Sequence, residues 1–402
     1  MLTRRGLLAG AAGSAGAVIG AGAGYFAGAK GILDQGPAGS ASAGAASAKR
    51  PNGFDDPLGI ECEIHRHATL LSFAALPGTD RAAMQRWMAL ITDDIASLVA
   101  GTAPSGDPQP ELAQGDGRLG ISVGFGPTLF DKLGLRHKQP DGFVELPSFK
   151  IDRLEDRFSH GDVLIQIQGD LPLQVAHAAR VLQRDSAAFA RVKWQQDGFT
   201  QDSTVGNSTK VQRNLMGQVD GTDNPVPGSD DFTNLVRISD GPAWCRGGTQ
   251  LVVRRIRMKL DTWDVLGRDQ KESTIGRRLD NGAPLGAHHL NDPIDLQARD
   301  ASGLTVIPDY AHVRRASATN LEERFYRRPY NYLNISPGVE TADAGMLWMA
   351  YAKNLAKQYL PVQTRLADFD LLNVWTVPVG SATFVIAPPA NSGEIIAQGL
   401  FV

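Results

Sequence analysis

The sequence predicts an α+β fold made of two ferredoxin-like units, each with the order β-α-β-β-α-β and an antiparallel sheet. Two observations predict this class: short apolar runs alternate with amphipathic stretches in the first half, and similar segments recur in the second half. The 402 residues, 42% of them hydrophobic and 21% charged, suffice for two modest domains. We therefore predict an N-terminal domain over 58–204 and a C-terminal domain over 205–402.

The elements of the first unit follow from hydrophobic periodicity. The stretch TLLSFAAL (69–76) is a short apolar run that predicts a buried strand. In the next segment Met84, Trp87, Ile91 and Ile95 fall on one face at helical spacing. The complete predicted order is a strand at 69–76, a helix at 81–101, strands at 118–126 and 161–169, a helix at 171–184 and a strand at 190–196.

The second unit repeats this pattern less regularly. The predicted elements are a strand at 249–260, a helix at 261–278, a strand at 345–353, a helix at 354–368 interrupted by Pro361, and a strand at 381–389. Residues 205–248 and 267–344 show little periodicity and are predicted to be long loops. Loops of that length are usually functional or disordered. We expect two open sheets that share one core, with these loops available for a ligand.

The first 48 residues resemble an export signal. Arg4 and Arg5 precede a weakly apolar, glycine-rich run without charge from Gly6 to Ala29, which is typical of a twin-arginine signal. Ala46-Ser47-Ala48 is a candidate cleavage site, and 49–57 is predicted to be a linker. Because the twin-arginine machinery carries folded proteins, this route suits a cofactor inserted before export to the cell envelope or exterior. The alternative is an uncleaved membrane anchor, since the run is long enough to cross a bilayer.

Charge and cysteine content exclude two classes. The net charge of −3 gives no global basic field, so a nucleic-acid partner is not expected. The two cysteines, Cys62 and Cys245, rule out a disulfide framework. They could form one bridge or remain two buried thiols.

One acidic residue stands out in the stretch MGQVDGTDNP. Asp220 lies between Gly217 and Gly221 in a segment rich in turn-forming residues. Ordinary turn chemistry is one interpretation. The other is that the loop presents Asp220 to a ligand, with glycines that let the backbone approach closely.

A basic cluster surrounds one of the eight histidines, His312. Five arginines follow it within the same predicted loop, namely Arg314, Arg315, Arg324, Arg327 and Arg328. Such a cluster favours an anionic partner such as phosphate, carboxylate or haem propionate. The alternative is a solvated basic face.

Five ordered segments resemble the dye-decolorizing peroxidase family. They are GQVDG (217–221), which fits the family's G-x-x-D-G motif, together with GFGPTLFDKLGL, GGTQLVVRRIRMKLDTWD, IGRRLDNGAPLG and GSATFVIAPPA. The resemblance extends from Leu58 to Val402. It implies two ferredoxin-like domains, with one haem b held in the C-terminal half. It also implies an enzyme that reduces hydrogen peroxide and oxidises dyes, phenolics or similar electron donors. Because family members are also described as haem-handling proteins, deferrochelatase-like release of iron from haem remains the alternative.

The resemblance also implies roles for individual residues. His312 takes the position of the axial ligand of the haem iron, and Asp370 that of the acid bonded to its imidazole. Asp220 and Arg327 take the distal catalytic positions. The cofactor-binding residues are then His312, Asp370, Arg327, Gly221, Thr222, Asp223 and Arg277. The chain departs from the family at Ser317-Ala318-Thr319, where Asn-Pro-Arg is common, and at Pro329, where glycine is common. These departures concern haem-edge contacts and the stiffness of the distal loop.

The chemistry of a haem peroxidase agrees with these assignments. A histidine that donates its second N–H to a carboxylate is an electron-rich ligand. Cleavage of peroxide needs a group that moves a proton from one oxygen to the other, which a positioned carboxylate can do. An arginine would stabilise the negative charge that develops on the departing oxygen and keep Asp220 ionised.

Two further features are open. In ECEIHRH, Glu61, Glu63, His65 and His67 would share one face if the segment were a strand, and could hold a second metal; a solvated edge strand is the alternative. Four aromatic residues are candidates for carrying electrons to donors too large for the haem pocket, although core packing is the other interpretation. They are Trp263, Trp348, Tyr351 and Trp375.

Overall fold

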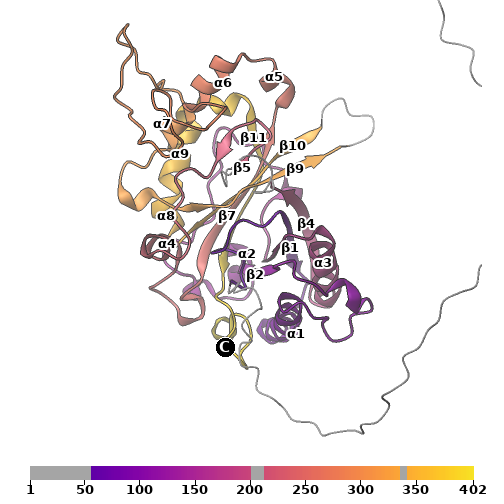
Figure 1. Ribbon diagram of the computed structural model, residues 1–402. Coiled ribbons are helices and arrows are strands. Elements are labelled where there is room, and N and C mark those ends of the chain that lie inside the picture. The colour runs from indigo at the N-terminus through magenta and orange to yellow at the C-terminus, as the bar shows by residue number, and fades with distance from the viewer. Residues whose placement is uncertain (1–55, 201–211, 336–341) are drawn as a thin grey trace, which may run out of the picture. The chain divides into compact units, whose positions relative to one another are not determined.

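The computed structural model describes residues 56–200, 212–335 and 342–402. Its main feature is a nine-stranded antiparallel sheet to which both halves of the chain contribute (Figure 1). The strand order is β7-β11-β2-β3-β1-β4-β9-β10-β8, with an additional pairing between β7 and β10. The α+β class with antiparallel sheets is thus confirmed.

The first half forms a complete β-α-β-β-α-β unit. Its elements are β1 (His67–Ala75), α1 (Arg81–Val99), β2 (Gly120–Phe125), α2 (Pro127–Lys132), β3 (Val163–Gly169), α3 (Pro172–Ser186) and β4 (Ala190–Phe199). The spatial order β4-β1-β3-β2 is that of a ferredoxin-like sheet. The predicted strands and helices all occur, and the short helix α2 was not predicted. Asp80 begins α1 because its side chain accepts a hydrogen bond from the Ala83 amide at 2.8 Å.

The second half contains an equivalent unit with the spatial order β11-β7-β10-β9. Its elements are β7 (Thr249–Met258), α5 (Leu260–Asp264), α6 (Arg268–Ile275), β9 (Tyr330–Asn334), β10 (Asp343–Ala352), α8 (Leu355–Gln358), α9 (Leu360–Phe369) and β11 (Thr376–Ile386). The helix predicted at 261–278 is divided at Gly267. The helix interrupted by Pro361 is also two helices, because proline is favoured in the first turn of α9.

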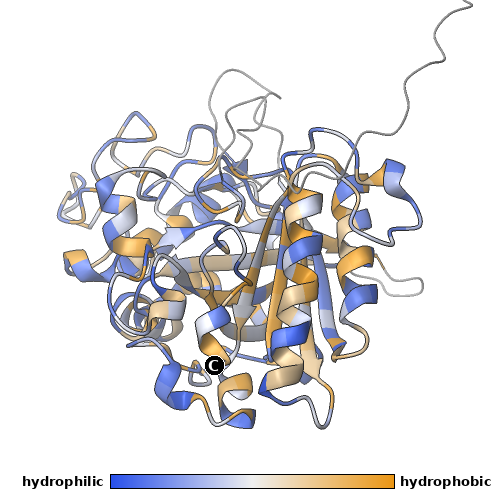
Figure 2. Ribbon diagram, turned by 90° about the horizontal axis from the view of Figure 1, so that it is seen from below, coloured by the Kyte–Doolittle hydropathy of each residue, from blue (hydrophilic) through white to orange (hydrophobic). Residues whose placement is uncertain are grey.

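The strands of the two units are joined at two seams into one sheet, whereas two separate open sheets were predicted. β2 pairs with β11 through Phe125 and Gly124, and β4 meets β9 through the pair Phe199 and Asn331. Together with the β7–β10 pairing these seams close the sheet on itself. The predicted shared core lies on the face common to both halves, where Leu70 and Leu164 pack in one cluster with residues of β7, β10 and β11. In Figure 2 the strands are largely hydrophobic and the peripheral loops largely hydrophilic.

The two segments predicted to be loops contain regular structure, and this part of the prediction was wrong. The first includes the hairpin β5 (Gln212–Arg213) and β6 (Val219–Asp220), followed by α4 (Asp230–Val236). The second includes α7 (His312–Ala316), β8 (Tyr326–Arg327) and β9. These elements are too short to leave a clear periodic pattern in the sequence.

The predicted signal, its cleavage site and nearly all of the predicted linker lie outside the described residues. Within the described residues, no helix is both long enough and apolar enough to cross a membrane.

Candidate functional site

The centre of the site is a hydrogen bond between His312 and Asp370. The imidazole Nδ1 lies 2.6 Å from the carboxylate Oδ2 of Asp370. Asp370 ends α9 and begins the next helical turn, where its other oxygen, Oδ1, accepts the Leu372 amide at 2.9 Å. The adjacent Leu371 amide donates to the Tyr310 carbonyl at 3.0 Å and so ties the segment before His312 to the end of α9.

This arrangement orients the ring of His312. Burial lowers the pKa of the imidazole, but the Asp370 carboxylate outweighs it, so the pKa lies above its usual range. The side chain of Asp370 is 3% exposed and that of His312 34% exposed. With Nδ1 bonded to the carboxylate, Nε2 has no hydrogen bond to any described residue.

Asp220 lies in a tight hairpin and not in an irregular loop. It pairs with Gln212 as the last residue of β6. Gly217 and Gly221 flank the strand with φ angles of 81° and 76°, a region in which only glycine is unstrained. The Asp220 carboxylate accepts the Gly221 amide at 2.8 Å. The glycines therefore shape the backbone on both sides of a partly exposed acid.

Arg327 lies at the end of β8, where Asn224 holds it. The Asn224 Oδ1 accepts from the Arg327 amide at 3.0 Å and from its Nε at 3.3 Å, and the Asn224 Nδ2 donates to the Arg327 carbonyl at 2.7 Å. Asn224 follows Asp220 by four residues, so the acidic loop and the arginine strand are directly connected. Within the described chain no ion pair forms between Asp220 and Arg327.

The charges of these groups act on one another. Arg327 lowers the pKa of His312 and Asp220 raises it, each as a smaller contribution than burial and Asp370. The pKa of Arg277 is lowered by burial and then by Arg327, whereas Asp223 raises it. The structure therefore groups the predicted residues within electrostatic range of each other.

The remaining predicted residues differ in their surroundings. Arg277 is 8% exposed and donates to the carbonyls of Gly282 and Leu290 at 2.7 and 3.2 Å. Thr222 and Gly221 are half-buried, and Asp223 is exposed.

The basic cluster after His312 is neither one anion site nor a solvated face. Arg314 donates to the carbonyls of Leu296 and Ile307, and Arg324 pairs with Asp231 at 2.7 Å. Arg315 lies with its guanidinium 5.1 Å from the centre of the Phe369 ring. Its buried Nε has no hydrogen-bond partner among the described residues. Unlike Arg314 and Arg324, which pair with Asp309 and Asp231, Arg315 and Arg327 form no ion pair among the described residues and are the candidates for binding an anion.

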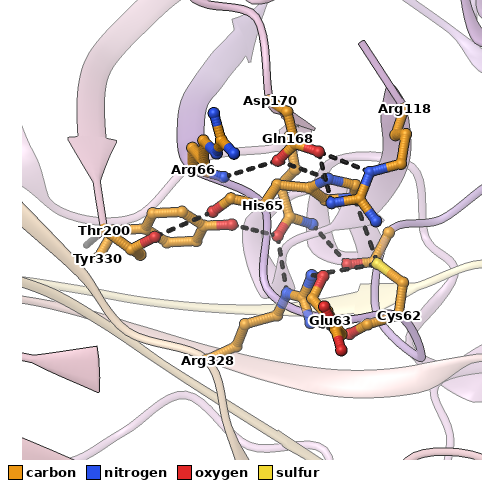
Figure 3. A network of polar contacts seen from close by, with 11 residues as sticks. Cys62, Glu63, His65, Arg66, Arg118, Gln168, Asp170, Thr200, Arg328 and Tyr330 are labelled. Atoms are coloured by element: carbon orange, nitrogen blue, oxygen red, sulfur yellow. Dashed lines mark hydrogen bonds and ion pairs between the residues drawn. The ribbon is translucent and has the colours of Figure 1, made fainter. Parts of the chain in front are cut away.

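Arg328 is 1% exposed and belongs to a buried polar network (Figure 3). It donates to the Cys62 carbonyl at 2.7 Å, to the Glu63 carbonyl at 2.9 Å and to the Gln168 side chain at 2.9 Å. These contacts fasten β8, and hence Arg327, to the N-terminal half. In the sequence, neither the spacing of the arginines nor the residues around them distinguish Arg328 from the half-buried arginines nearby.

The second-metal alternative is not supported. Residues 61–66 are not a strand, since β1 begins at His67. Among the residues placed by the structure, no group of three or more His, Cys, Asp or Glu is arranged to hold a metal ion. Glu61 instead pairs with Arg237, and His65 contacts the Cys62 sulfur at 3.2 Å. Cys62 and Cys245 are both buried free thiols.

The four aromatic candidates are core residues or lie close to the core. Trp263 and Tyr351 have no exposed surface, and Trp348 and Trp375 are half-buried. Trp263 packs edge-to-face on Trp375 with ring centres 5.3 Å apart. A role in carrying electrons remains a prediction.

Comparison with known proteins agrees with this geometry. Residues 59–200 match the family model described as Dyp-type peroxidase, N-terminal, and residues 211–392 match the corresponding C-terminal model. The chain is 39% identical over 289 residues to a dye-decolorizing peroxidase from Thermobifida fusca, covering 70% of this chain and 67% of the relative. It is 33% identical over 355 residues to a deferrochelatase from Yersinia pestis, covering 82% and 80%.

Solved structures give the same result. A DyP-type peroxidase from Cellulomonas bogoriensis superposes with a TM-score of 0.82 at 42% identity, covering 85% of this chain and 95% of the other. Ferric DtpA from Streptomyces lividans superposes with a TM-score of 0.81 at 34% identity, covering 85% and 94%. Matches to both family models account for most of the described chain. The protein therefore belongs to the Dyp-type peroxidase family.

Proposed function

We propose that this protein is a haem b peroxidase that reduces hydrogen peroxide and oxidises dyes, phenolics or similar one-electron donors. The observation that carries the proposal is the His312–Asp370 pair. It fixes Nδ1 as the donor to a carboxylate and leaves Nε2 free to coordinate iron. Solved relatives are described as ferric and oxyferrous DtpA, which supports an iron centre in the family.

The residues present fit haem. His312 provides a neutral nitrogen ligand with its second nitrogen bonded to an acid, as haem iron commonly has. The unpartnered Nε of Arg315 and the buried guanidinium of Arg277 would suit the propionates. Gly221, Thr222 and Asp223 would line the cofactor beside Asp220. Bound haem supplies the redox chemistry with peroxide.

The side chains of Asp220 and Arg327 would transfer the proton and stabilise charge in the reaction with peroxide. Asp220 would accept the proton from one oxygen of hydrogen peroxide and deliver it to the other, so that water leaves. Arg327 would stabilise the negative charge that develops on the departing oxygen. Asp220 is partly exposed in a hairpin shaped by glycines, which supports a carboxylate positioned mainly by its backbone.

Spectroscopy tests the proposal directly. The purified protein should have a ferric haem spectrum that changes on mixing with hydrogen peroxide and returns when a phenolic donor is added. A haem-free protein that neither takes up haem nor turns over peroxide would refute it.

Relatives named deferrochelatase support a second candidate function, release of iron from haem. Both functions require His312, and measured products distinguish them. Peroxide-dependent donor oxidation with haem left intact supports the peroxidase, whereas iron release with recovery of metal-free porphyrin supports the alternative.

We further propose export by the twin-arginine route. Arg4 and Arg5 before a weakly apolar run support this proposal. Retention in the membrane by an uncleaved N-terminus is the alternative, which fractionation of cells would distinguish.

A further inference from the structure

The side chain of Asn224 contacts Arg327 at both its backbone and its guanidinium. Three hydrogen bonds join the two residues. The amide and the Nε of Arg327 donate to Asn224 Oδ1 at 3.0 and 3.3 Å, and Asn224 Nδ2 donates to the Arg327 carbonyl at 2.7 Å. We propose that Asn224 is a positioning residue, which holds the Arg327 guanidinium and the Asp220 loop as a single unit. This inference rests on the proposed function of Arg327 and Asp220.

The guanidinium of Arg327 depends on Asn224 because the other constraints act elsewhere. The following residue, Arg328, is fixed through its buried side chain (Figure 3) and through its amide, which donates to the Met349 carbonyl at 3.0 Å. These contacts fix the course of β8. Among the described residues, the Arg327 guanidinium donates a hydrogen bond to Asn224 Oδ1, and no carboxylate forms an ion pair with the guanidinium.

Asn224 is connected along the chain both to a proline and to Asp220. It precedes Pro225, which restricts its backbone to extended conformations. Asp220, four residues earlier, ends the β6 strand of the same loop. A shift of the loop would therefore move Asp220 and the acceptor of Arg327 together.

A neutral amide suits this position better than a carboxylate. An amide oxygen orients the guanidinium without neutralising it, so the positive charge stays available to a developing negative charge. A carboxylate 3.3 Å from Nε would form an ion pair with Arg327, and the guanidinium would then stabilise the developing negative charge less. A carboxylate also lacks the N–H that the Arg327 carbonyl accepts.

A double-mutant cycle tests the inference. The variants Asn224→Ala, Arg327→Ala and the double variant are compared by stopped-flow mixing of the haem-loaded protein with hydrogen peroxide. We expect Asn224→Ala to slow the peroxide reaction roughly 10- to 100-fold, as small misplacement of a catalytic group does. In the Arg327→Ala background the same substitution should change the rate less than about twofold, since no guanidinium remains to be positioned. Equal slowing in both backgrounds would overturn the inference.

Hydrogen exchange gives a readout independent of peroxide turnover. The Arg327 amide should exchange faster in Asn224→Ala than in the wild type, because its acceptor is lost; unchanged exchange would contradict the geometry. Asn354→Ala is the matched control. It removes an asparagine that caps α8 by accepting the Lys357 amide at 3.0 Å, and this hydrogen bond involves no residue of the site. It should leave both readouts unchanged.

Two outcomes separate this inference from the proposed function. If Arg327→Ala keeps the wild-type rate, the proposed role of Arg327 is wrong. If Arg327→Ala is slow but Asn224→Ala is not, only the role of Asn224 is wrong. Should Asn224→Ala fail to fold, Asn224→Asp has nearly the same shape and must also slow the reaction, because it neutralises the arginine; a wild-type rate in that variant would overturn the inference.

Discussion

Replacing Asp370 with asparagine should preserve the shape of the site but make His312 a weaker ligand for haem iron. The carboxylate performs two tasks with two oxygens: Oδ2 accepts from the imidazole at 2.6 Å, and Oδ1 accepts from the Leu372 amide at 2.9 Å. An asparagine has one oxygen, so it can serve the helix cap or the histidine but not both. It also removes the charge that raises the pKa of His312.

The magnitude follows from the bond that is lost. A hydrogen bond to a charged group contributes about 1.5–3 kcal/mol, which corresponds to roughly 10- to 100-fold in an equilibrium or a rate. Removal of a carboxylate partner from a metal-bound histidine typically costs about the same factor. We therefore expect Asp370→Asn to weaken haem binding or peroxidase turnover by roughly 10- to 100-fold.

The assay is titration of the haem-free protein with haem, followed by the rate of peroxide-dependent donor oxidation. Asp368→Asn is the matched control, because Asp368 lies two residues earlier and makes an exposed ion pair with Lys150 at 3.0 Å. Exposed pairs contribute little, so the control should behave as the wild type. If Asp370→Asn differs from this control by less than twofold in both measurements, the proposed dependence of His312 on the Asp370 carboxylate is refuted.

Three other variants test the distal acid, the export signal and a buried carboxylate separately. Asp220→Ala should leave haem binding intact and slow the peroxide reaction by about 10²- to 10⁴-fold in stopped flow. A wild-type rate would mean that the GQVDG stretch is an ordinary turn without a catalytic role. Arg4→Lys together with Arg5→Lys should retain the protein in the cytoplasm, and unchanged export of the double variant would exclude the proposed route. Asp94 is 3% exposed, and burial followed by the neighbouring Asp185 raises its pKa from 3.8 to about 7. Protonated Asp94 therefore stabilises the fold below about pH 4, and this contribution is lost as the pH rises through about 7. Asp94→Asn should raise the free energy of unfolding at pH 8, by about 4 kcal/mol at most, and change it little at pH 4. Equal gains at both pH values in urea denaturation would contradict this.

Much of the scaffold was predictable because its elements carry local patterns. The two long helices of the first unit, α1 and α3, and its four strands follow from apolar periodicity, because the strands are buried on both faces. β9 was missed because it follows arginines and Pro329 and is defined by pairing with β10 and β4. Hairpin β5–β6 has only two residues in each strand, too few for any alternation to show.

The roles of the site residues could be expected from residue type and family resemblance, whereas most of their contacts with residues far along the chain could not. The association of His312 with Asp370 came from the family resemblance, and the structure places the two within hydrogen-bond distance. The different environments of the arginines could not be predicted, because burial of Arg328 results from contacts with Cys62 and Gln168, more than 150 residues away in sequence. Asn224 was missed for a related reason. In the sequence it is an ordinary turn residue before proline, and its function depends on a strand 103 residues later.

The absorption spectrum of His312→Ala after reconstitution with haem tests the central claim most directly. If His312 is the axial ligand, the variant should lose the spectrum of histidine-ligated ferric haem and retain little of the cofactor after gel filtration. An Asp220→Ala sample prepared in parallel should retain both, since that substitution removes no ligand. A wild-type Soret band and full haem content in His312→Ala would mean that another residue binds the iron and that the assignment of His312 as its ligand is wrong.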